Sequence, residues 1–491
     1  MAGRTASDGG NRNGGAPPRR GVTGSFHPPA YFNAAQSIAA SADVWMSGFA
    51  SAEALHRSAE RRLHDMVRFA RNHSAFYREL YRDLPKEIGS LRDLPVVDKS
   101  TLMASFDGCV TDAAVTSTVA AQFTQDESLI GHPLLGRYAV WTSSGTSGHP
   151  GMFLHDGQAL AVYDALELIR FRRMTPPAPM AGGLLPGDRY AVVSANGGHF
   201  LSNSTVNRVQ QLYPWLAARI RLFSIMAATP TLTRELDDFR PTWLATYPTA
   251  AIMLAAEQAA GRLSIAPREI RVGGEQFTHA ERDRVEAAFG CPVRNDYGCS
   301  EFPPITWECA HRGMHVNSDW VTLEPVDEAM QPVPAGQPSH SVLLTNLVNR
   351  IQPLIRYDLG DSITWLTEPC ACGSPFPTIR VAGRCDDLVT LSGASGHTVS
   401  LLPLALTTVL EEHAGLFHFQ LFRPDAGRLS LRLDPDRTDV AAGQRACDAL
   451  QRFLHAHGTG DVQIDVELRA FEPCGASGKL KRIFAHGSAV A

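Results

Sequence analysis

Residues 243–301 read WLATYPTAAIMLAAEQAAGRLSIAPREIRVGGEQFTHAERDRVEAAFGCPVRNDYGCSE. Short apolar runs at 243–247, 269–272 and 292–296 have the length of buried strands, and longer segments with helical periodicity lie between them. Thr278 and Glu281 form a capping-box signature ahead of a helix that ends at Gly290. Alternation of strands and helices predicts an α/β fold with a mainly parallel sheet flanked by helices.

The same alternation extends towards the N-terminus, and a different pattern follows residue 384. Strands are predicted at 138–142, 189–194 and 219–225, and Asp156 is expected to cap the helix after the first. Beyond residue 384 the order is helix (401–413), two strands (417–422 and 428–433), helix (442–455) and strand (462–471). We therefore predict a tail at 1–25 that is disordered by composition, a large domain at 26–384 and a small, hinged α+β domain at 385–491.

Composition narrows the function classes. The 491 residues carry a formal net charge of −5, which gives no electrostatic reason to expect nucleic acid or an anionic membrane as the partner. No apolar stretch reaches the roughly 18–20 residues of a spanning helix, and the N-terminus lacks the apolar region of a secretory signal. Nine scattered cysteines suggest reduced thiols, so a cytoplasmic location is expected.

A serine- and glycine-rich loop follows the predicted strand at 138–142. It comprises Ser143, Ser144, Gly145, Thr146, Ser147 and Gly148. Glycines let the backbone approach phosphate oxygens, and the amides and hydroxyls can cradle an anion. The loop lacks the lysine pattern of a Walker A motif, and taken by itself it is equally compatible with a flexible surface loop. No nucleophile elbow supports a serine hydrolase.

Further motifs follow in a fixed order. They are SSGTSGHPG (143–151), GGEQF (273–277), YGCSE (297–301), IRYDLGD (355–361), CACG (370–373), GRCDDLVTLSG (383–393) and SGKLKR (477–482). Each is weak singly. Together they resemble the adenylate-forming superfamily of acyl-CoA synthetases, adenylation domains and luciferases, and within it the phenylacetate–CoA ligase branch.

That resemblance implies a role for each matching residue. The Ser143–Gly148 loop would hold the β- and γ-phosphates of ATP, Ser300 the α-phosphate and Glu301 a Mg²⁺ ion. Gly273, Gly274 and Glu275 would line the adenine and acyl side, Asp296 and Tyr297 would contact adenine, and Asp361 and Arg384 would serve the ribose. Asp386 would be the hinge, and Lys479 would bridge the substrate carboxylate and the α-phosphate.

Two departures from the family pattern affect these expectations. His149 stands where the family usually has a lysine, and Gly151 where it has a lysine or threonine, which predicts a less basic phosphate loop. The segment LVTLSGASGHTVS (388–400) also differs from the family's usual thiol-channel sequence. This second departure bears on the acyl acceptor more than on adenylation.

A cysteine–histidine set suggests a structural zinc site. Cys309 and His315, with His311 as a rival, lie about 55 residues before Cys370 and Cys372. Three sulfurs and an imidazole suit tetrahedral Zn²⁺. Reduced structural cysteines at a turn are the alternative.

The favoured function is an AMP-forming acid–thiol ligase. It would use ATP and Mg²⁺ to activate a carboxylic acid, which the branch suggests is aryl or arylacetic, and would transfer the acyl group to coenzyme A. A carrier-protein thiol or an amine is the alternative acceptor. A protein that binds nucleotide or zinc without turnover is the alternative class. Relatives are often dimers, so a homodimer is an additional expectation.

Overall fold

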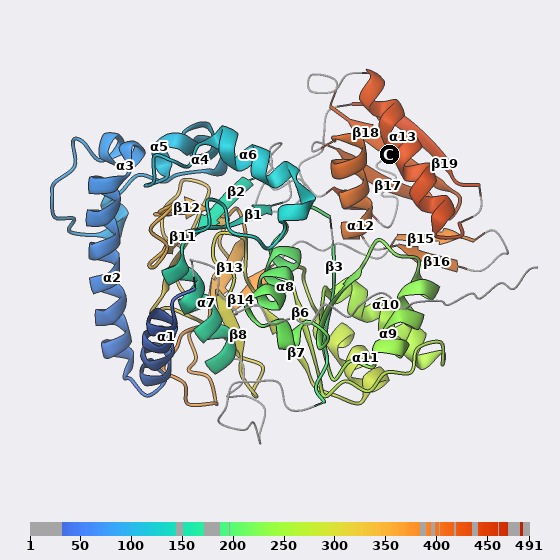
Figure 1. Ribbon diagram of the computed structural model, residues 1–491, viewed down its shortest axis with the longest axis horizontal. Coiled ribbons are helices and arrows are strands. Elements are labelled where there is room, and N and C mark those ends of the chain that lie inside the picture. Colours follow the sequence, from blue (N-terminus) through green and yellow to red (C-terminus); the bar gives the residue numbers. More distant parts are fainter. Residues whose placement is uncertain are drawn as a thin grey trace, which may run out of the picture.

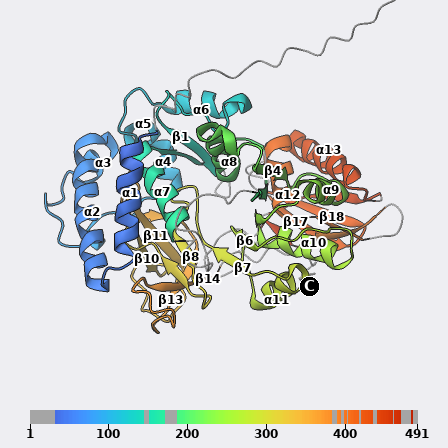
Figure 2. The same ribbon diagram turned by 60° about the horizontal axis from the view of Figure 1, so that its bottom comes forward.

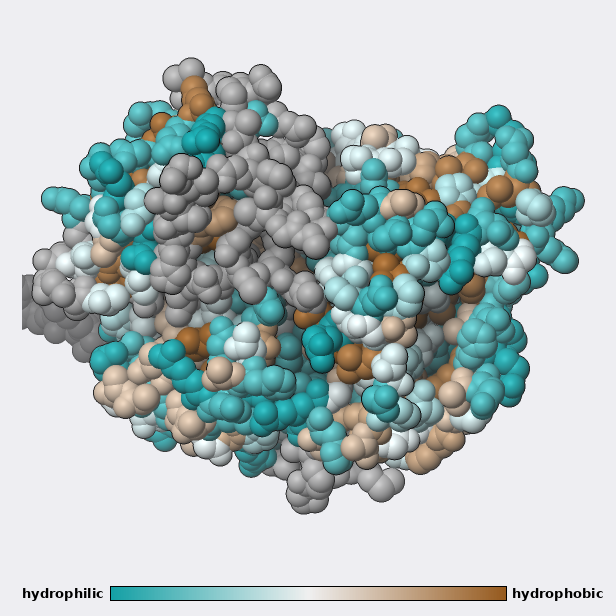
Figure 3. Space-filling view, turned by 180° about the vertical axis from the view of Figure 1, so that it is seen from behind, coloured by the Kyte–Doolittle hydropathy of each residue, from teal (hydrophilic) through white to brown (hydrophobic). Residues whose placement is uncertain are grey.

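The computed structural model describes residues 32–143, 151–170, 187–195, 197–382, 389–393, 398–401, 403–416, 419–434, 440–459, 461–469 and 482–484. Figure 1 shows the first helices at one end of the molecule and the last elements of the chain at the opposite end. No helix within these ranges is both long enough and apolar enough to cross a membrane. Seen from behind, hydrophobic side chains are scattered among hydrophilic ones (Figure 3).

The N-terminal part of the chain is helical. Its helices are α1 (Ala34–Ser47), α2 (Ala52–His73), α3 (Ala75–Leu80), α4 (Lys99–Ala104), α5 (Phe106–Cys109) and α6 (Ser117–Gln125), with single 3₁₀ turns at Leu91–Asp93 and Glu127–Leu129. Ser74 separates α2 from α3: it ends α2, and its hydroxyl accepts a hydrogen bond from the Tyr77 amide. This hydroxyl caps the N-terminus of α3.

A five-stranded parallel sheet forms the centre, in the order β4-β3-β5-β6-β7. Its strands and helices are β3 (Tyr190–Ser194), α8 (Leu201–Leu212), β4 (Ile220–Ser224), α9 (Thr229–Phe239), β5 (Trp243–Thr246), α10 (Pro248–Ala259), β6 (Glu269–Gly273), α11 (His279–Phe289) and β7 (Val293–Asp296), with a 3₁₀ turn at Pro214–Leu216. The predicted α/β alternation is confirmed here. The capping box at Thr278 and Glu281 and the left-handed Gly290 bound α11 as expected.

The strand before the serine- and glycine-rich loop lies outside this sheet. β1 (Ala139–Ser143) pairs in antiparallel fashion with β2 (Gly151–His155), and α7 (Gly157–Ile169) follows, capped by Asp156. The alternation pattern had suggested that this strand joined the parallel set. Antiparallel neighbours need only a short connection, whereas a parallel pair needs a crossover, so the seven residues between β1 and β2 are sufficient.

Two antiparallel sheets that the pattern did not predict complete the large part of the fold. One has the order β10-β11-β12 and the other β13-β14-β9-β8. Their strands are β8 (Thr306–Glu308), β9 (Met314–Val316), β10 (Val321–Val326), β11 (Ser341–Asn346), β12 (Tyr357–Asp358), β13 (Ser362–Trp365) and β14 (Thr378–Ala382). Several are shorter than five residues, so their periodicity carries little signal.

The C-terminal elements form an α+β unit. They are the hairpin β15 (Val389–Ser392) and β16 (Thr398–Leu401), α12 (Pro403–Thr408), a π-helical turn (Val409–His413), β17 (Gln420–Asp425), β18 (Arg428–Leu433), α13 (Val440–Ala456), β19 (Gln463–Leu468) and β20 (Ile483–Phe484). One hydrophobic cluster contains buried side chains of this unit, such as Leu406, and of α10, such as Leu254. Figure 2 shows the unit beside α9 and α10.

Candidate functional site

Two turns meet at the carboxyl edge of the parallel sheet, where α/β proteins bind ligands. Gly273 ends β6 and is paired with Asp296 at the end of β7. A Cβ atom at Gly273 would collide with the Asp296 carboxylate, so glycine is required for this close approach. Burial, with Glu167 nearby, raises the pKa of Asp296 to about 7.

Tyr297 links this edge to the IRYDLGD segment. Its hydroxyl donates a hydrogen bond of 2.9 Å to Oδ2 of Asp361, 64 residues further along the chain. Burial and the Asp361 carboxylate together raise the pKa of Tyr297 well above its ordinary value, so the hydroxyl keeps its proton. The structure thus brings together two residues to which the resemblance assigns adenine and ribose.

The turn that carries Ser300 and Glu301 is fixed through its backbone by three buried side chains. His155 Nε2 donates to the Ser300 carbonyl at 2.9 Å, and Asn346 Nδ2 donates to the Glu301 carbonyl at 3.1 Å. The Tyr163 hydroxyl accepts a hydrogen bond from Asn346 at 2.8 Å and donates to Nδ1 of His155 at 3.2 Å. Burial lowers the pKa of His155 to about 3, which keeps the imidazole neutral and its tautomer defined.

A lysine that the sequence did not single out joins the phosphate loop to the turn. Lys99 Nζ donates to Oγ of Ser143 at 2.9 Å, and its charge opposes the burial that raises the pKa of Glu301. Glu301 is 7% exposed, so a cation near its carboxylate is needed to offset desolvation. The one feature of the sequence that could have drawn attention to Lys99 is the rarity of lysine: only four of the 45 Lys and Arg residues are lysines.

Gly151 makes room for this lysine. A Cβ atom there would lie 2.6 Å from Cε2 of Phe153, 2.8 Å from Cε of Lys99 and 2.9 Å from Oγ of Ser143. The Gly151 amide also donates to Oγ of Ser143 at 3.2 Å. The departure from the family pattern at residue 151 therefore coincides with a lysine that arrives from another part of the chain.

Backbone pairing with the IRYDLGD segment places Lys99. The Val97 amide donates to the Arg356 carbonyl at 3.0 Å, and the Asp358 amide donates to the Val97 carbonyl at 2.9 Å. The Tyr357 hydroxyl on the same segment donates to the Glu301 carboxylate. The lysine and the carboxylate are thus held from one short stretch of backbone.

The GGEQF turn is held by α10. Oε2 of Glu275 accepts a hydrogen bond of 2.9 Å from the Thr249 amide, and the Thr249 hydroxyl donates to the same carboxylate at 2.8 Å. This is the favourable position for a negative charge at a helix N-terminus. Gly274 has a φ of +84° and faces the Tyr247 ring, which explains the second glycine.

The predicted cysteine–histidine set also comes together. The ligand atoms of Cys309, His315, Cys370 and Cys372 lie within 4.8 Å of one another. His311, the rival ligand, is exposed. We call these four residues the cysteine–histidine cluster.

The four ligand atoms of the cluster lie close enough together to hold one metal ion. Cys309 Sγ lies 3.5 Å from Cys370 Sγ, and Cys372 Sγ lies 3.2 Å from Nε2 of His315. Nδ1 of His315 donates to the Phe376 carbonyl at 2.8 Å, which directs the lone pair of Nε2 towards the sulfurs. Burial lowers the pKa of His315, so the ring is neutral, as a metal ligand requires.

Some expected site residues cannot be placed. Ser144, Gly145, Thr146, Ser147, Gly148, Arg384, Asp386 and Lys479 lie outside the described residues. Their roles remain predictions from the resemblance.

The fold is that of the adenylate-forming ligases. A solved structure of 2-hydroxyisobutyryl-CoA ligase, with its acyl-AMP and coenzyme A in the thioesterification state, matches with a TM-score of 0.56 at 23% identity. The match covers 89% of this chain and 90% of that one. The predicted fold class is therefore confirmed.

Sequence similarity indicates the branch. The chain is 26% identical to phenylacetate-coenzyme A ligase of Thermus thermophilus over 385 residues, which is 73% of this chain and 75% of that protein. It is 30% identical to the protein CapK of Staphylococcus aureus over 132 residues, 26% of this chain and 28% of that protein. No family model matches the chain. The predicted resemblance to the phenylacetate–CoA ligase branch is confirmed.

Proposed function

We propose that this chain is an AMP-forming acid–CoA ligase. In the first step a carboxylate oxygen attacks the α-phosphorus of ATP, and pyrophosphate leaves with the electrons of the broken P–O bond. In the second step the sulfur of coenzyme A attacks the acyl carbon, AMP leaves, and the thiol proton is released. Each step needs charge neutralisation and alignment more than it needs a covalent intermediate on the protein.

One observation carries the proposal: Glu301, Lys99 and Ser143 meet beside the carboxyl edge of the parallel sheet. Two anions must approach each other for the first step, so the region needs positive charge close to the phosphates. Lys99 supplies such a charge at the start of the loop, which the sequence had suggested was poorly basic. The hydrogen-bonded pair Tyr297 and Asp361 would contact the adenine and the ribose of the same nucleotide.

Mg²⁺ fits this arrangement as a companion of ATP. A buried carboxylate beside phosphate-binding groups is the usual oxygen ligand for this hard cation. Glu301 meets that description, and the nearby Lys99 ammonium offsets its charge in the absence of the ion. When bound, the metal would neutralise charge on the transferred phosphates.

The domain division belongs to the same proposal. We assign residues 26–384 to the ATP- and acid-binding domain and 385–491 to a small domain that moves about Asp386. In the first step Lys479 is delivered to the substrate carboxylate, and the small domain then rotates to admit the thiol. The α+β unit after residue 388 has a four-stranded sheet of its own, β19-β18-β17-β20, which supports this division.

Phenylacetate as the substrate of the Thermus relative supports an aryl or arylacetic acid here. Coenzyme A in the matched ligase structure supports it as the acceptor. A cytoplasmic location agrees with the described cysteines, none of which is disulfide-bonded.

Zn²⁺ is proposed for the cysteine–histidine cluster as a structural ion. The donor set of three thiols and one neutral imidazole matches closed, four-coordinate zinc sites. Glycine at residue 313 keeps a side chain away from the ligand atoms, since a Cβ atom there would lie 2.7 Å from Cys370 Sγ. Elemental analysis should find about one zinc per chain, and Cys372→Ala should lose the metal and melt at a lower temperature.

The direct test is pyrophosphate release with ATP and Mg²⁺ across aryl, arylacetic and aliphatic acids, with and without coenzyme A. Glu301→Gln should abolish acid-dependent release, while Glu328→Gln, a change to an exposed surface residue, should leave it unchanged. Thioester that forms only with coenzyme A would identify the acceptor, and competition with a carrier-protein thiol or an amine would test the alternatives. ATP binding without release for any acid would refute the ligase assignment.

A further inference from the structure

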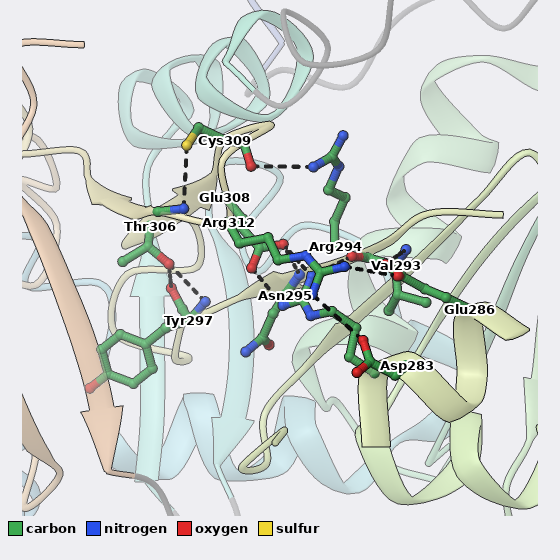
Figure 4. A network of polar contacts seen from close by, with 12 residues as sticks. Asp283, Glu286, Val293, Arg294, Asn295, Tyr297, Thr306, Glu308, Cys309 and Arg312 are labelled. Carbon is green, nitrogen blue, oxygen red and sulfur yellow. Dashed lines mark hydrogen bonds and ion pairs between the residues drawn. The ribbon is translucent and has the colours of Figure 1, made fainter. Parts of the chain in front are cut away.

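The short strand β8 lies between the proposed nucleotide site and the cysteine–histidine cluster. Thr306 begins the strand, and Cys309 follows its last residue. The Tyr297 amide donates to Oγ1 of Thr306 at 2.9 Å, and the Thr306 amide donates to the Tyr297 carbonyl at 3.0 Å. One end of β8 is therefore bonded to the turn assigned to adenine (Figure 4).

A buried ion pair joins the other end of β8 to Arg282 of α11, and Arg282 also donates to the Val293 carbonyl of β7. Glu308 is 3% exposed and accepts hydrogen bonds of 2.9 and 2.6 Å from Arg282. The same carboxylate accepts the Asn295 amide at 3.0 Å, and Arg294 donates to the Cys309 carbonyl at 3.2 Å (Figure 4). Removing one partner of such a pair leaves an uncompensated buried charge, so β7 and β8 should move together.

The cluster holds β8 from the opposite side. Cys309 contributes its sulfur to the cluster, and the Trp307 ring stacks on His315 with 4.5 Å between ring centroids. A strand of three residues has little stability of its own. Its position therefore depends on its neighbours: the Glu308 contacts on one side, and on the other its antiparallel pairing with β9, the strand that carries His315 of the cluster.

We propose that β8 couples the metal occupancy of the cluster to nucleotide affinity, with Thr306 and Glu308 as positioning residues. A bound metal fixes Cys309 and His315, which fixes β8 and thereby the Tyr297 backbone and its hydroxyl bond to Asp361. Without the metal, the sulfurs are no longer held together, and the turn loses its support. The inference rests on the proposed function for the identity of the nucleotide.

The test measures AMP affinity by calorimetry, since AMP contacts the adenine and ribose positions and needs no Mg²⁺. AMP affinity is measured for three proteins: the wild type, Thr306→Val and Thr233→Val. Each is measured zinc-loaded and again after chelation and dialysis. Thr233 is a matched control because it is buried and hydrogen-bonded but lies on α9. Metal removal should weaken AMP binding about five- to tenfold in the wild type and the control, as expected for the loss of a well-formed hydrogen bond.

In zinc-loaded Thr306→Val, AMP binding should already be weakened, and chelation should change it less than about twofold. Hydrogen exchange at residues 295–301 should rise on metal removal in the wild type. Equal AMP affinity with and without zinc, equal effects of chelation in all three proteins, or the lack of bound zinc would overturn the inference. Metal-dependent AMP binding without pyrophosphate release from any acid would refute the proposed ligase activity and leave the coupling standing.

Discussion

Lys99→Met is the substitution that most directly tests whether Lys99 binds the phosphates of ATP. It removes the ammonium 2.9 Å from Ser143 Oγ and the charge that opposes the raised pKa of Glu301. A hydrogen bond to a charged group contributes about 1.5–3 kcal/mol. If that contact is transferred to the β- and γ-phosphates, kcat/KM for ATP should fall roughly 10- to 150-fold.

Pyrophosphate release under kcat/KM conditions, with the best acid from the panel, measures this effect. Lys99→Arg should recover part of the rate because it restores the charge. Lys86→Met is the matched control, since that lysine is exposed. AMP affinity should be unchanged in Lys99→Met, because AMP lacks the β- and γ-phosphates.

Two results would rule out Lys99 as a contact for the β- and γ-phosphates. One is a Lys99→Met enzyme with kcat/KM for ATP within twofold of the Lys86→Met control. The other is an equal loss of AMP affinity and of kcat/KM, which would indicate a general distortion of the site. A melting curve for each variant separates loss of folding from loss of charge.

Gly151→Ala should displace Lys99 and lower kcat/KM for ATP by roughly two- to tenfold, measured as pyrophosphate release, with AMP affinity unchanged. Tyr297→Phe removes the hydrogen bond to Asp361 and should weaken AMP binding about three- to tenfold by calorimetry; unchanged affinity would contradict the assigned contact. Burial raises the pKa of Asp296 from 3.8 to about 7, so the folded state favours the protonated form, and stability should fall as pH rises from about 4 to 7. Melting temperatures of the wild type minus those of Asp296→Asn should decline across this window, and a flat difference would contradict the shift.

Much of the fold could be predicted because its signals are local. The central strands and helices each carry their own periodicity, and Thr278 with Glu281 marks a helix start in four residues. The β1–β2 pairing could not be read in this way. No strand was expected at Gly151–His155, so the partner of β1 was missing; the seven-residue connection to it is too short for a parallel pair.

The cysteine–histidine cluster was predictable from residue type, although Cys309 and Cys370 are 61 residues apart. Cys370 and Cys372 form a C-x-C pair, and Cys309 and His315 follow shortly after the YGCSE turn, which is what brought these four residues together as one set. The choice of His315 over His311 depended on burial. His315 lies on β9 facing the sulfurs, whereas His311 is in the exposed turn before that strand.

The role of Lys99 could not be predicted because its contact with Ser143 is created by the tertiary fold. It lies 44 residues before Ser143, and no spacing rule connects the two. What places it is the pairing of Val97 with the IRYDLGD segment, where Arg356 adopts a left-handed φ of 49°. That conformation is uncommon outside glycine, and it is held here by a hydrogen bond from the Arg356 amide to Oγ1 of Thr345 at 3.0 Å.

Lys99 and Gly151 depend on each other, because the glycine leaves the space that the Lys99 side chain occupies. A loop that carried its cation at residue 151 would place a side chain in the space of the Lys99 stem. A cation supplied by another segment instead requires that the loop stay small at this residue. The two arrangements exclude each other sterically. Gly151 first suggested a weakly basic phosphate loop, but it is required for the contact between Lys99 and Ser143. Restoring a lysine at residue 151 should therefore lower activity unless Lys99 is shortened at the same time.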